Sequence, residues 1–319
     1  MIKIAIIGLG HIGQIHLAAI NSIKEYRLIG ICDKKVYEYQ NMVSKSVKTF
    51  TDYFEMLNKL EIDVVVIATP NDTHFNIACD VITMGLNVIL EKPASNNLIQ
   101  LKKMQDLAIK NRVFIYYAFH SALSLEVNTF FDFYKNNKET FGPLIGFSSF
   151  FYDPYIKNNQ IIKKAKGLEN CWLDSGVNAL SIIDKFSPVS NLKNLVTRKS
   201  FINENIYSSI SCSFSISDEA ENLIGTGNIE TAWDQDINKK ITYLCFQEKN
   251  KLILLDHSNQ KVFEITSGNL KLLYSFEGDR LLNHYLGIFK EFYNLYVTDR
   301  VFNFSESLRI HNLLFNSLT

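Results

Sequence analysis

The sequence has no excess of either charge: 33 lysine and arginine residues balance 33 aspartate and glutamate residues among 319. The basic surplus that would neutralise nucleic-acid phosphates is therefore missing. No apolar run is long enough to cross a bilayer. The apolar start of the chain is too short, and too soon interrupted by glycines, for a signal peptide. We therefore expect no nucleic-acid partner and no membrane partner.

Cysteine is scarce as well. The five cysteines are scattered, odd in number and never spaced as C-x-x-C: Cys32, Cys79, Cys171, Cys212 and Cys245. This pattern predicts neither a disulfide framework nor a zinc site, and it suits a reducing compartment. We expect a cytoplasmic protein without a bound metal.

What the sequence does contain is a dinucleotide-binding pattern at its start. Ile2 to Ile7 form an apolar run with a single lysine, which is typical of a strand buried on both faces of a parallel sheet. Gly8, Gly10 and Gly13 follow in G-x-G-x-x-G spacing and lead into a helical stretch. In this pattern Gly8 makes the tight turn, Gly10 lets the backbone approach a pyrophosphate, and Gly13 lets the helix lie close to the strand. The helix N-terminus would hold the phosphates.

A second apolar strand, from Arg27 to Cys32, ends at Asp33. An acid at this place holds the ribose hydroxyls of the adenosine and repels a 2′-phosphate, which favours NAD. Lys34 and Lys35 would bind that phosphate if Asp33 turned away, so NADP is the alternative. The sequence therefore predicts NAD or NADP, with NAD favoured by Asp33.

The first part of the chain alternates predicted strands and helices. After a short strand at Lys48 to Phe50, Thr51 is the expected N-cap of a helix. The runs 63–68, 87–91 and 113–117 then predict further strands, separated by helical segments. Six such steps complete a doubly wound, dinucleotide-binding domain over residues 1–120.

Beyond residue 120 this rhythm changes. Helical segments at 123–134 and 175–186 flank a strand at 144–152, and residues 191–275 hold mostly strand-like segments. Two helices close the chain. Long antiparallel strands of this kind build a sheet with helices on one face. We therefore predict the α/β class, with a doubly wound parallel sheet followed by an α+β domain over residues 121–319. That second domain would carry a large, open, mixed but mostly antiparallel sheet, the substrate site and the oligomer contacts.

Three motifs together resemble the Gfo/Idh/MocA oxidoreductases: Gly8-Leu-Gly-His-Ile-Gly13, Ala68-Thr-Pro-Asn-Asp-Thr-His74 and Glu91-Lys-Pro93. The resemblance covers the whole chain and implies a Rossmann domain followed by an open-faced sheet domain that holds the substrate. The last triplet is the most specific, because its lysine, here Lys92, reaches both nicotinamide and substrate in the family. Besides Lys92 and the glycines, the resemblance implies these cofactor contacts: His11, Ile12, Asp33, Thr69, Pro70, Asn71, His74 and Glu91.

A finer resemblance appears downstream. Phe119-His-Ser121, the segment Leu173 to Ile182 and Glu306-Ser-Leu-Arg309 resemble the branch that contains L-arabinose 1-dehydrogenase and D-galactose 1-dehydrogenase. Phe119 replaces the tryptophan of that branch, and Ser175 replaces its proline. These departures bear on the identity of the sugar more than on the reaction.

Lys92 is predicted at the carboxyl end of a parallel strand, where ligands bind in open α/β sheets. An ammonium there can hydrogen-bond the reacting oxygen and assist proton transfer. The alternative is an ordinary surface lysine. The proline after it favours an extended conformation at Lys92 and allows a cis peptide bond.

Asp174 and Asn178 are four residues apart, so one edge of a helix can carry both if Asp174 caps that helix. Asp174 is then either a catalytic residue or only an N-cap. Many superfamily members have a histidine base where Asn178 stands. An amide cannot take up a proton, so the base would be Asp174 or Lys92, with Asn178 orienting the sugar oxygen. A hemiacetal hydroxyl is more acidic than a simple secondary alcohol, which favours oxidation at sugar C1.

Two further residues have two interpretations each. His120 either hydrogen-bonds a sugar hydroxyl or is a structural histidine. Trp172 either stacks on the apolar face of a pyranose or belongs to the core.

The leading interpretation is an NAD(P)-dependent aldose 1-dehydrogenase that gives a lactone. The alternatives are oxidation elsewhere on a sugar, including a nucleotide-sugar in polysaccharide synthesis, and a protein that senses cofactor or sugar without turnover. An open sheet face is usually covered by a partner subunit, which predicts a homodimer or homotetramer.

Overall fold

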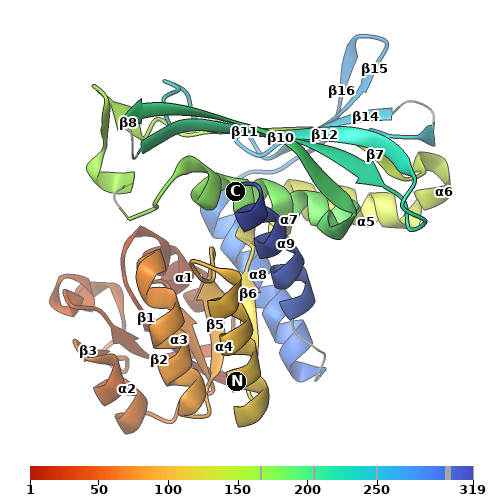
Figure 1. The fold of residues 1–319 in the computed structure, drawn as a ribbon. Coiled ribbons are helices and arrows are strands. Elements are labelled where there is room, and N and C mark those ends of the chain that lie inside the picture. Colours follow the sequence, from red (N-terminus) through yellow and green to blue (C-terminus); the bar gives the residue numbers. More distant parts are fainter. Residues whose placement is uncertain (166, 204–205, 249–250, 299–302, 319) are drawn as a thin grey trace. The chain divides into compact units, whose positions relative to one another are not determined.

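The computed structural model describes residues 1–165, 167–203, 206–248, 251–298 and 303–318 (Figure 1). The chain divides into two compact units. The first combines Met1–Phe119 with Leu281–Leu308, and the second combines His120–Arg280 with Arg309–Thr319. The first unit thus takes in a helical stretch from near the end of the sequence. The assignment of substrate binding to residues 121–319 remains a prediction.

The first unit is built on a six-stranded sheet of order β3-β2-β1-β4-β5-β6. All its neighbouring strands are parallel, which confirms the predicted doubly wound sheet. Its strands are β1 (Ile2–Ile7), β2 (Tyr26–Cys32), β3 (Lys48–Phe50), β4 (Val64–Ile67), β5 (Asn87–Glu91) and β6 (Ile115–Ala118). Its helices are α1 (His11–Asn21), α2 (Tyr53–Lys59), α3 (His74–Thr83), α4 (Leu98–Asn111) and most of α8 (Arg280–Val297), with short 3₁₀ turns at Val36–Met42 and Asn71–Thr73.

The central strands are continuous apolar runs because both of their faces are covered. All four residues of β4 are buried, and three of them are valines. One helix start differs from the prediction. Asp52, not Thr51, caps α2, since its Oδ1 accepts hydrogen bonds from the N–H groups of Phe54 and Glu55. Threonine and aspartate are both favoured N-cap residues, so residue type alone does not decide which of Thr51 and Asp52 caps the helix.

The second unit is built on an eight-stranded sheet of order β10-β11-β12-β7-β13-β14-β15-β16. Only the pair β12–β7 is parallel among these neighbours, so the sheet is mixed and mostly antiparallel, as predicted. Its strands are β7 (Leu144–Tyr152), β10 (Leu192–Asn203), β11 (Ile206–Ser217), β12 (Leu223–Ala232), β13 (Lys239–Phe246), β14 (Lys251–Asp256), β15 (Lys261–Thr266) and β16 (Asn269–Ser275). The second unit also holds a small β8–β9 ribbon (Ile156–Lys157, Gln160–Ile161), helices α5 (Leu125–Asn136), α6 (Lys138–Phe141) and α7 (Val177–Phe186), the 3₁₀ turns His120–Leu123, Lys163–Ala165 and Val189–Asn191, and a π-helical turn at Trp172–Gly176. Helix α9 (Phe304–Asn316) is divided between the units, and its part from Arg309 on belongs to the second.

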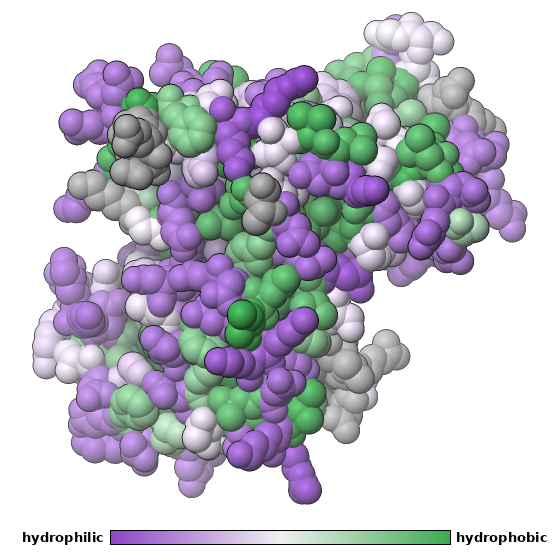
Figure 2. All heavy atoms as spheres, viewed as in Figure 1, coloured by the Kyte–Doolittle hydropathy of each residue, from purple (hydrophilic) through white to green (hydrophobic). Residues whose placement is uncertain are grey.

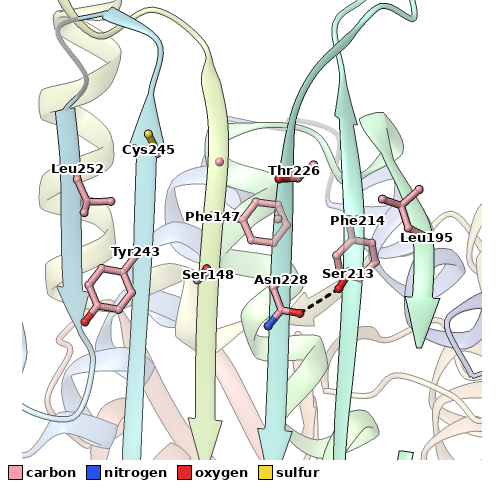
Figure 3. A pocket seen from close by; sticks show the side chains of 12 residues that line it. Phe147, Ser148, Leu195, Ser213, Phe214, Thr226, Asn228, Tyr243, Cys245 and Leu252 are labelled. Atoms are coloured by element: carbon pink, nitrogen blue, oxygen red, sulfur yellow. Dashed lines mark hydrogen bonds between the residues drawn. The ribbon is translucent and has the colours of Figure 1, made fainter. Parts of the chain in front are cut away.

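Helices α5 and α7 pack along one face of this sheet (Figure 1). Phe130 of α5, Phe186 of α7 and Phe246 of β13 meet there with ring centroids 5.8–6.3 Å apart. The opposite face carries the alternate residues of the strands. A hollow of about 440 Å³ lies along the sheet and is lined by residues of β7 and β10–β14. Figure 3 shows several of these side chains, among them Ser148, Asn228 and Tyr243.

The face of the molecule in Figure 2 carries hydrophilic residues throughout, with smaller hydrophobic groups between them. Within the described ranges, no helix combines the length and the apolar character needed to cross a membrane.

Candidate functional site

The glycine loop between β1 and α1 has the geometry that its sequence pattern predicts. Gly8 has φ of +93°, and a Cβ there would lie 2.6 Å from the Ala68 carbonyl oxygen. A Cβ at Gly13 would lie 2.0 Å from the Gly8 carbonyl oxygen, so only glycine lets α1 approach the strand this closely. A Cβ at Gly10 would meet no atom within 4 Å. Gly10 therefore borders open space, where a larger residue would fill the cradle for a ligand.

Helix α1 begins at His11 with Gly10 at its N-cap, and no side chain caps it. The first N–H groups of a helix have no partner inside the helix, so they are available to an anion such as a pyrophosphate. His11 is exposed and Ile12 is half-buried at this helix start.

Asp33, the residue after β2, is fixed beside this loop. Its Oδ2 accepts a hydrogen bond from the Leu9 N–H at 2.7 Å, and its Oδ1 accepts one from the Lys35 N–H at 2.8 Å. Lys34 and Lys35 are exposed next to it. Both Asp33 oxygens keep further lone pairs, so the carboxylate can still accept from ribose hydroxyls.

The turn after β4 brings Thr69, Pro70 and Asn71 to the same edge of the sheet. Asn71 is 8% exposed, and its Nδ2 is buried without a hydrogen-bond partner in the described part of the chain. A buried amide donor of this kind is costly unless a further acceptor meets it. Together with the open Gly10 cradle and Asp33, this donor fits a dinucleotide.

His74 lies behind that turn and joins it to the next one. Its Nε2 is 2.9 Å from the Thr69 carbonyl oxygen, and its Nδ1 is 2.9 Å from the Pro93 carbonyl oxygen. Burial lowers the pKa of His74, whereas the two carbonyl contacts and the charge of Glu91 act in the opposite direction. Because both ring nitrogens face protein carbonyls, the structure favours a supporting role for His74 over a cofactor contact.

Lys92 follows β5 directly and is half-buried, and its peptide bond to Pro93 is cis. Glu91 before it is buried, with His16 Nε2 2.8 Å and the Tyr285 hydroxyl 2.9 Å from its Oε1. Its Oε2 accepts from the Lys92 N–H at 3.2 Å. Protein groups thus occupy both oxygens of Glu91, which favours a supporting role for this residue too.

In the second unit, Asp174 sits inside the π-helical turn that precedes α7. Asn170 lies just before that turn, and its Oδ1 accepts from the N–H groups of Trp172 and Leu173 at 3.0 Å each. Of the two interpretations of Asp174, the N-cap is disfavoured because Asp174 lies inside the turn and not at its start, whereas the catalytic role stays a prediction.

Asn178 of α7 is close to Asp174, and its Nδ2 donates to the Asp174 carbonyl oxygen at 3.2 Å. Its Oδ1 is buried and has no hydrogen-bond partner among the residues that the structure describes. An acceptor in this state suits a hydroxyl group supplied by a ligand.

The sequence analysis missed an ionic cluster near Asp174. Lys240 of β13 pairs with Asp153, which also accepts from Asn238 at 3.2 Å and from Ser175 at 3.4 Å. Burial lowers the pKa of Lys240, and the charge of Arg280 acts in the same direction. The carboxylates of Asp153 and Asp174 oppose this shift. The feature of the sequence that could have indicated this cluster is a lysine, Lys240, at an inward-facing position of a predicted strand.

Trp172 is fully buried, and its indole N–H donates to the Leu314 carbonyl oxygen at 2.9 Å. This observation favours the core interpretation over stacking on a sugar. His120 is 7% exposed at the start of a 3₁₀ turn, with Nδ1 3.4 Å from the Ser121 hydroxyl. Its contact with a sugar stays a prediction.

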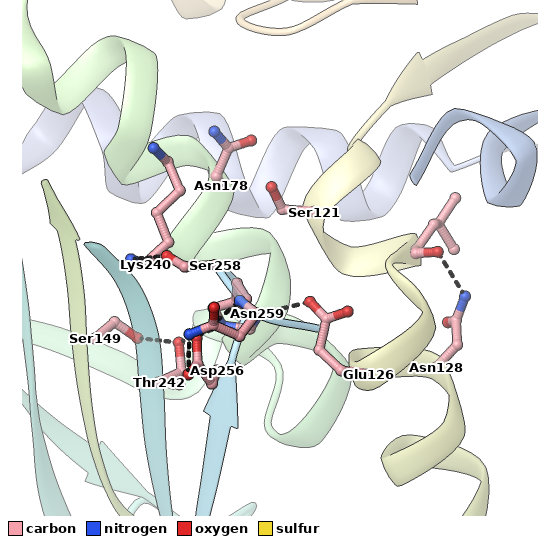
Figure 4. A network of polar contacts seen from close by, with 12 residues as sticks. Ser121, Glu126, Asn128, Ser149, Asn178, Lys240, Thr242, Asp256, Ser258 and Asn259 are labelled. Carbon is pink, nitrogen blue, oxygen red and sulfur yellow. Dashed lines mark hydrogen bonds and ion pairs between the residues drawn. The ribbon is translucent and has the colours of Figure 1, made fainter. Parts of the chain in front are cut away.

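A second polar network lies between α5 and the sheet (Figure 4). His257 contacts the Glu126 carboxylate at 2.9 Å and the Thr242 hydroxyl at 3.0 Å, and Thr242 contacts Ser149 at 3.0 Å. This order of acid, histidine and hydroxyl is that of a catalytic triad. All four side chains are buried, so no substrate reaches the hydroxyls and the network is structural. Among the described residues, no group of three or more His, Cys, Asp or Glu side chains could hold a metal ion.

Comparison with known proteins points to one family. Residues 2–119 match the model of the Gfo/Idh/MocA proteins, described as an oxidoreductase family with an NAD-binding Rossmann fold. The rhizopine catabolism protein MocA of Rhizobium meliloti is 27% identical over 111 residues, which cover 35% of this chain and 35% of that protein. D-glucoside 3-dehydrogenase of Escherichia coli is 27% identical over 128 residues, which cover 39% of this chain and 36% of that protein. The match thus spans about a third of the length of these curated relatives.

The fold comparison extends over the whole chain. An NAD binding oxidoreductase from Klebsiella pneumoniae superposes with a TM-score of 0.82 and 16% identity, covering 98% of this chain and 95% of that one. At this identity the similarity shows the fold alone, a Rossmann sheet followed by a mixed sheet.

Proposed function

We propose that this chain, whose residues 2–119 match the model of the Gfo/Idh/MocA oxidoreductase family, is a member of that family and an NAD(P)-dependent dehydrogenase acting on a hydroxyl of a sugar-type substrate. One observation carries the proposal. Lys92 follows β5 at the same edge of the parallel sheet as the glycine loop after β1 and Asp33 after β2. The strand order reverses between β1 and β4, and ligands of open α/β sheets bind at that point.

The cofactor would be held by the first turn of α1, Asp33 and the Asn71 amide. A bound nicotinamide cofactor would supply the redox chemistry by accepting hydride from the substrate carbon. NAD is the favoured form, because the fixed Asp33 carboxylate repels a 2′-phosphate. The exposed Lys34 and Lys35 are the groups that would allow NADP as well.

The chain's own residues would orient the substrate and manage its proton. Lys92 would hydrogen-bond the reacting hydroxyl. The hydroxyl proton would pass either to the Asp174 carboxylate or, if Lys92 is present as the neutral amine, to Lys92. The buried, unpartnered Oδ1 of Asn178 would accept a hydrogen bond from a sugar hydroxyl. His120 would bind another hydroxyl of the same substrate.

The finer proposal is oxidation at C1 of a galactose-like or arabinose-like aldose, giving a lactone. Asn178 supports this proposal, because an amide cannot serve as the base. A hemiacetal hydroxyl is more acidic than a simple secondary alcohol, so its oxidation depends less on a strong base. A second candidate is oxidation at another sugar carbon, free or on a nucleotide-sugar. The similarity to a D-glucoside 3-dehydrogenase favours that candidate.

We further propose that the protein forms a homodimer or homotetramer through the sheet face that α5 and α7 leave uncovered. The hollow of Figure 3 opens among strands of this sheet and includes exposed or half-buried apolar side chains such as Leu195 and Leu252. Light scattering of the purified protein tests this, and a monomer at micromolar concentration would contradict it.

The function is tested by nicotinamide absorbance on a panel of free aldoses, inositols, glucosides and nucleotide-sugars, with NAD and NADP supplied separately. Turnover of an aldose to a lactone supports C1 oxidation, and a keto product supports the second candidate. Cofactor binding without turnover of any member of the panel would contradict the enzyme proposal and favour a protein that senses cofactor or sugar.

A further inference from the structure

The carboxylate of Glu91 is a junction of three elements. It ends β5, its Oε1 meets His16 of α1 and Tyr285 of α8, and its Oε2 accepts the backbone N–H of Lys92. Glu91 is 5% exposed, and both His16 and Tyr285 are fully buried. A buried carboxylate is tolerated only when donors satisfy it, and here donors far apart in the sequence do so.

The two donors are themselves held in place by ring contacts. The His16 and Tyr285 rings stand edge to face with centroids 4.5 Å apart, and His16 also meets Phe289 at 5.6 Å. Aromatic pairs in this geometry restrict how either ring can turn. The direction of the Glu91 carboxylate is therefore fixed from two helices.

Lys92 is held on both sides as a result. Glu91 binds its N–H, and His74 binds the carbonyl of the next residue, Pro93. Burial would raise the pKa of Glu91, but hydrogen bonds and charge from His16, the charge of Lys92 and the Tyr285 hydroxyl hold it below its ordinary value. The Lys92 ammonium thus lies within electrostatic reach of a carboxylate.

We propose that Glu91 is a positioning residue for Lys92: it fixes the backbone at Lys92, and His16 and Tyr285 hold the Glu91 carboxylate in place. The inference rests on the proposed role of Lys92 in the reaction and adds the groups that prepare it. The titratable groups that face Glu91 are His16 from α1, Tyr285 from α8, and Lys92 and His74 at the sheet edge.

The decisive variants are Tyr285→Phe and Glu91→Gln. Tyr26→Phe is the matched control. The Tyr26 hydroxyl donates to the Phe289 carbonyl oxygen at 2.6 Å, so this substitution removes a buried hydrogen bond to the same helix, α8, and leaves the contacts of Glu91 unchanged. NAD affinity by fluorescence and thermal midpoints show whether each variant is folded and binds cofactor.

The first readout needs no substrate. Lysines are reductively methylated with ¹³C-formaldehyde, and the Lys92 signal is assigned with Lys92→Arg. At one fixed pH, the ¹³C shift of Lys92 should move in Glu91→Gln and in Tyr285→Phe, because the surroundings of its side chain change when its backbone is no longer held. Tyr26→Phe should leave the shift unchanged.

The second readout is steady-state kinetics on the substrate that the panel identifies. Tyr285→Phe should lower kcat about tenfold at nearly constant KM, as expected when a reacting group is misplaced rather than lost. Tyr26→Phe should keep the kcat and KM of the parent protein.

An unchanged Lys92 signal and unchanged kinetics in both Glu91→Gln and Tyr285→Phe would overturn the positioning role. Failure of the parent protein to turn over any substrate, with the Lys92 signal still moved in Glu91→Gln, would instead overturn the proposed function and leave the positioning of Lys92 by Glu91 standing.

Discussion

The Leu9 N–H donates to the Asp33 carboxylate over 2.7 Å, which ties the glycine loop to the end of the second strand. Asp33 cannot turn away from the loop without breaking this bond and the one from Lys35 at 2.8 Å. Hydrogen bonds to a charged group contribute about 1.5–3 kcal/mol each. The fixed carboxylate makes cofactor choice the first property to test.

Asp33→Ala should raise the KM for NAD about tenfold, because a charge-assisted contact to the ribose is lost. It should also improve the use of NADP relative to NAD, since Lys34 and Lys35 then face the 2′-phosphate without a competing acid. Steady-state kinetics with both cofactors measure the ratio. Asp106→Ala, on the exposed side of α4, is the control, and an unchanged ratio in Asp33→Ala would refute the role of Asp33.

Variants of Asn170 and Asp174 should affect different properties, the first the stability of the fold and the second the turnover. Asn170→Ala removes the acceptor of two helix N–H groups and should lower the free energy of unfolding by about 1 kcal/mol. Asp174→Asn should instead lower turnover about a hundredfold or more, the usual scale for a lost acid or base. Urea denaturation and nicotinamide absorbance measure the two effects. Full turnover in Asp174→Asn would show that Asp174 takes no part in the chemistry.

Asn178→Ala should raise the KM for the sugar about tenfold while NAD affinity stays the same, since a single hydrogen bond to substrate is removed. Asn312→Ala, an exposed asparagine of α9, is the matched control. An equal KM in Asn178→Ala and the control would mean that the unpartnered Asn178 oxygen does not meet the substrate.

Alkaline pH should destabilise the protein through its buried thiols. Burial raises the pKa of Cys212 from 9.0 to about 11, and those of Cys32 and Cys171 to about 12. Above pH 9 the unfolded chain loses thiol protons that the folded chain keeps. The stabilisation is therefore complete below pH 9 and is lost as the pH rises through the folded pKa values, by up to about 1.4 kcal/mol per pH unit for each thiol.

Urea denaturation at pH 8 and pH 10.5 measures this loss. Cys212→Ala, although less stable at pH 8 because of the cavity it leaves, should lose less stability between the two pH values than the parent protein. An equal loss in both proteins would show that Cys212 does not contribute.

Most of the first unit could be predicted from sequence because its signals are local. A strand buried on both faces is a continuous apolar run, as in β4, and the glycine spacing before α1 has a mechanical reason at Gly8 and Gly13. The caps were harder, since neighbouring polar residues such as Thr51 and Asp52 compete for one position.

The supporting contacts of the candidate site could not be predicted. Glu91 and Tyr285 are 194 residues apart, and Lys240 and Asp153 are 87 apart, so only the topology of each unit brings them together. A buried charge in an apolar strand indicates that a partner exists but not which residue it is.

The most direct test of the account compares Lys92→Met with Lys110→Met, an exposed lysine of α4, for nicotinamide reduction on the substrate that the panel identifies. The account predicts that Lys92→Met loses turnover by about 10²–10⁴-fold with NAD affinity within about twofold of the parent, as for a lost proton-transfer group. Lys110→Met should keep full activity. Equal turnover in the two variants would contradict the assignment of Lys92 to the reaction.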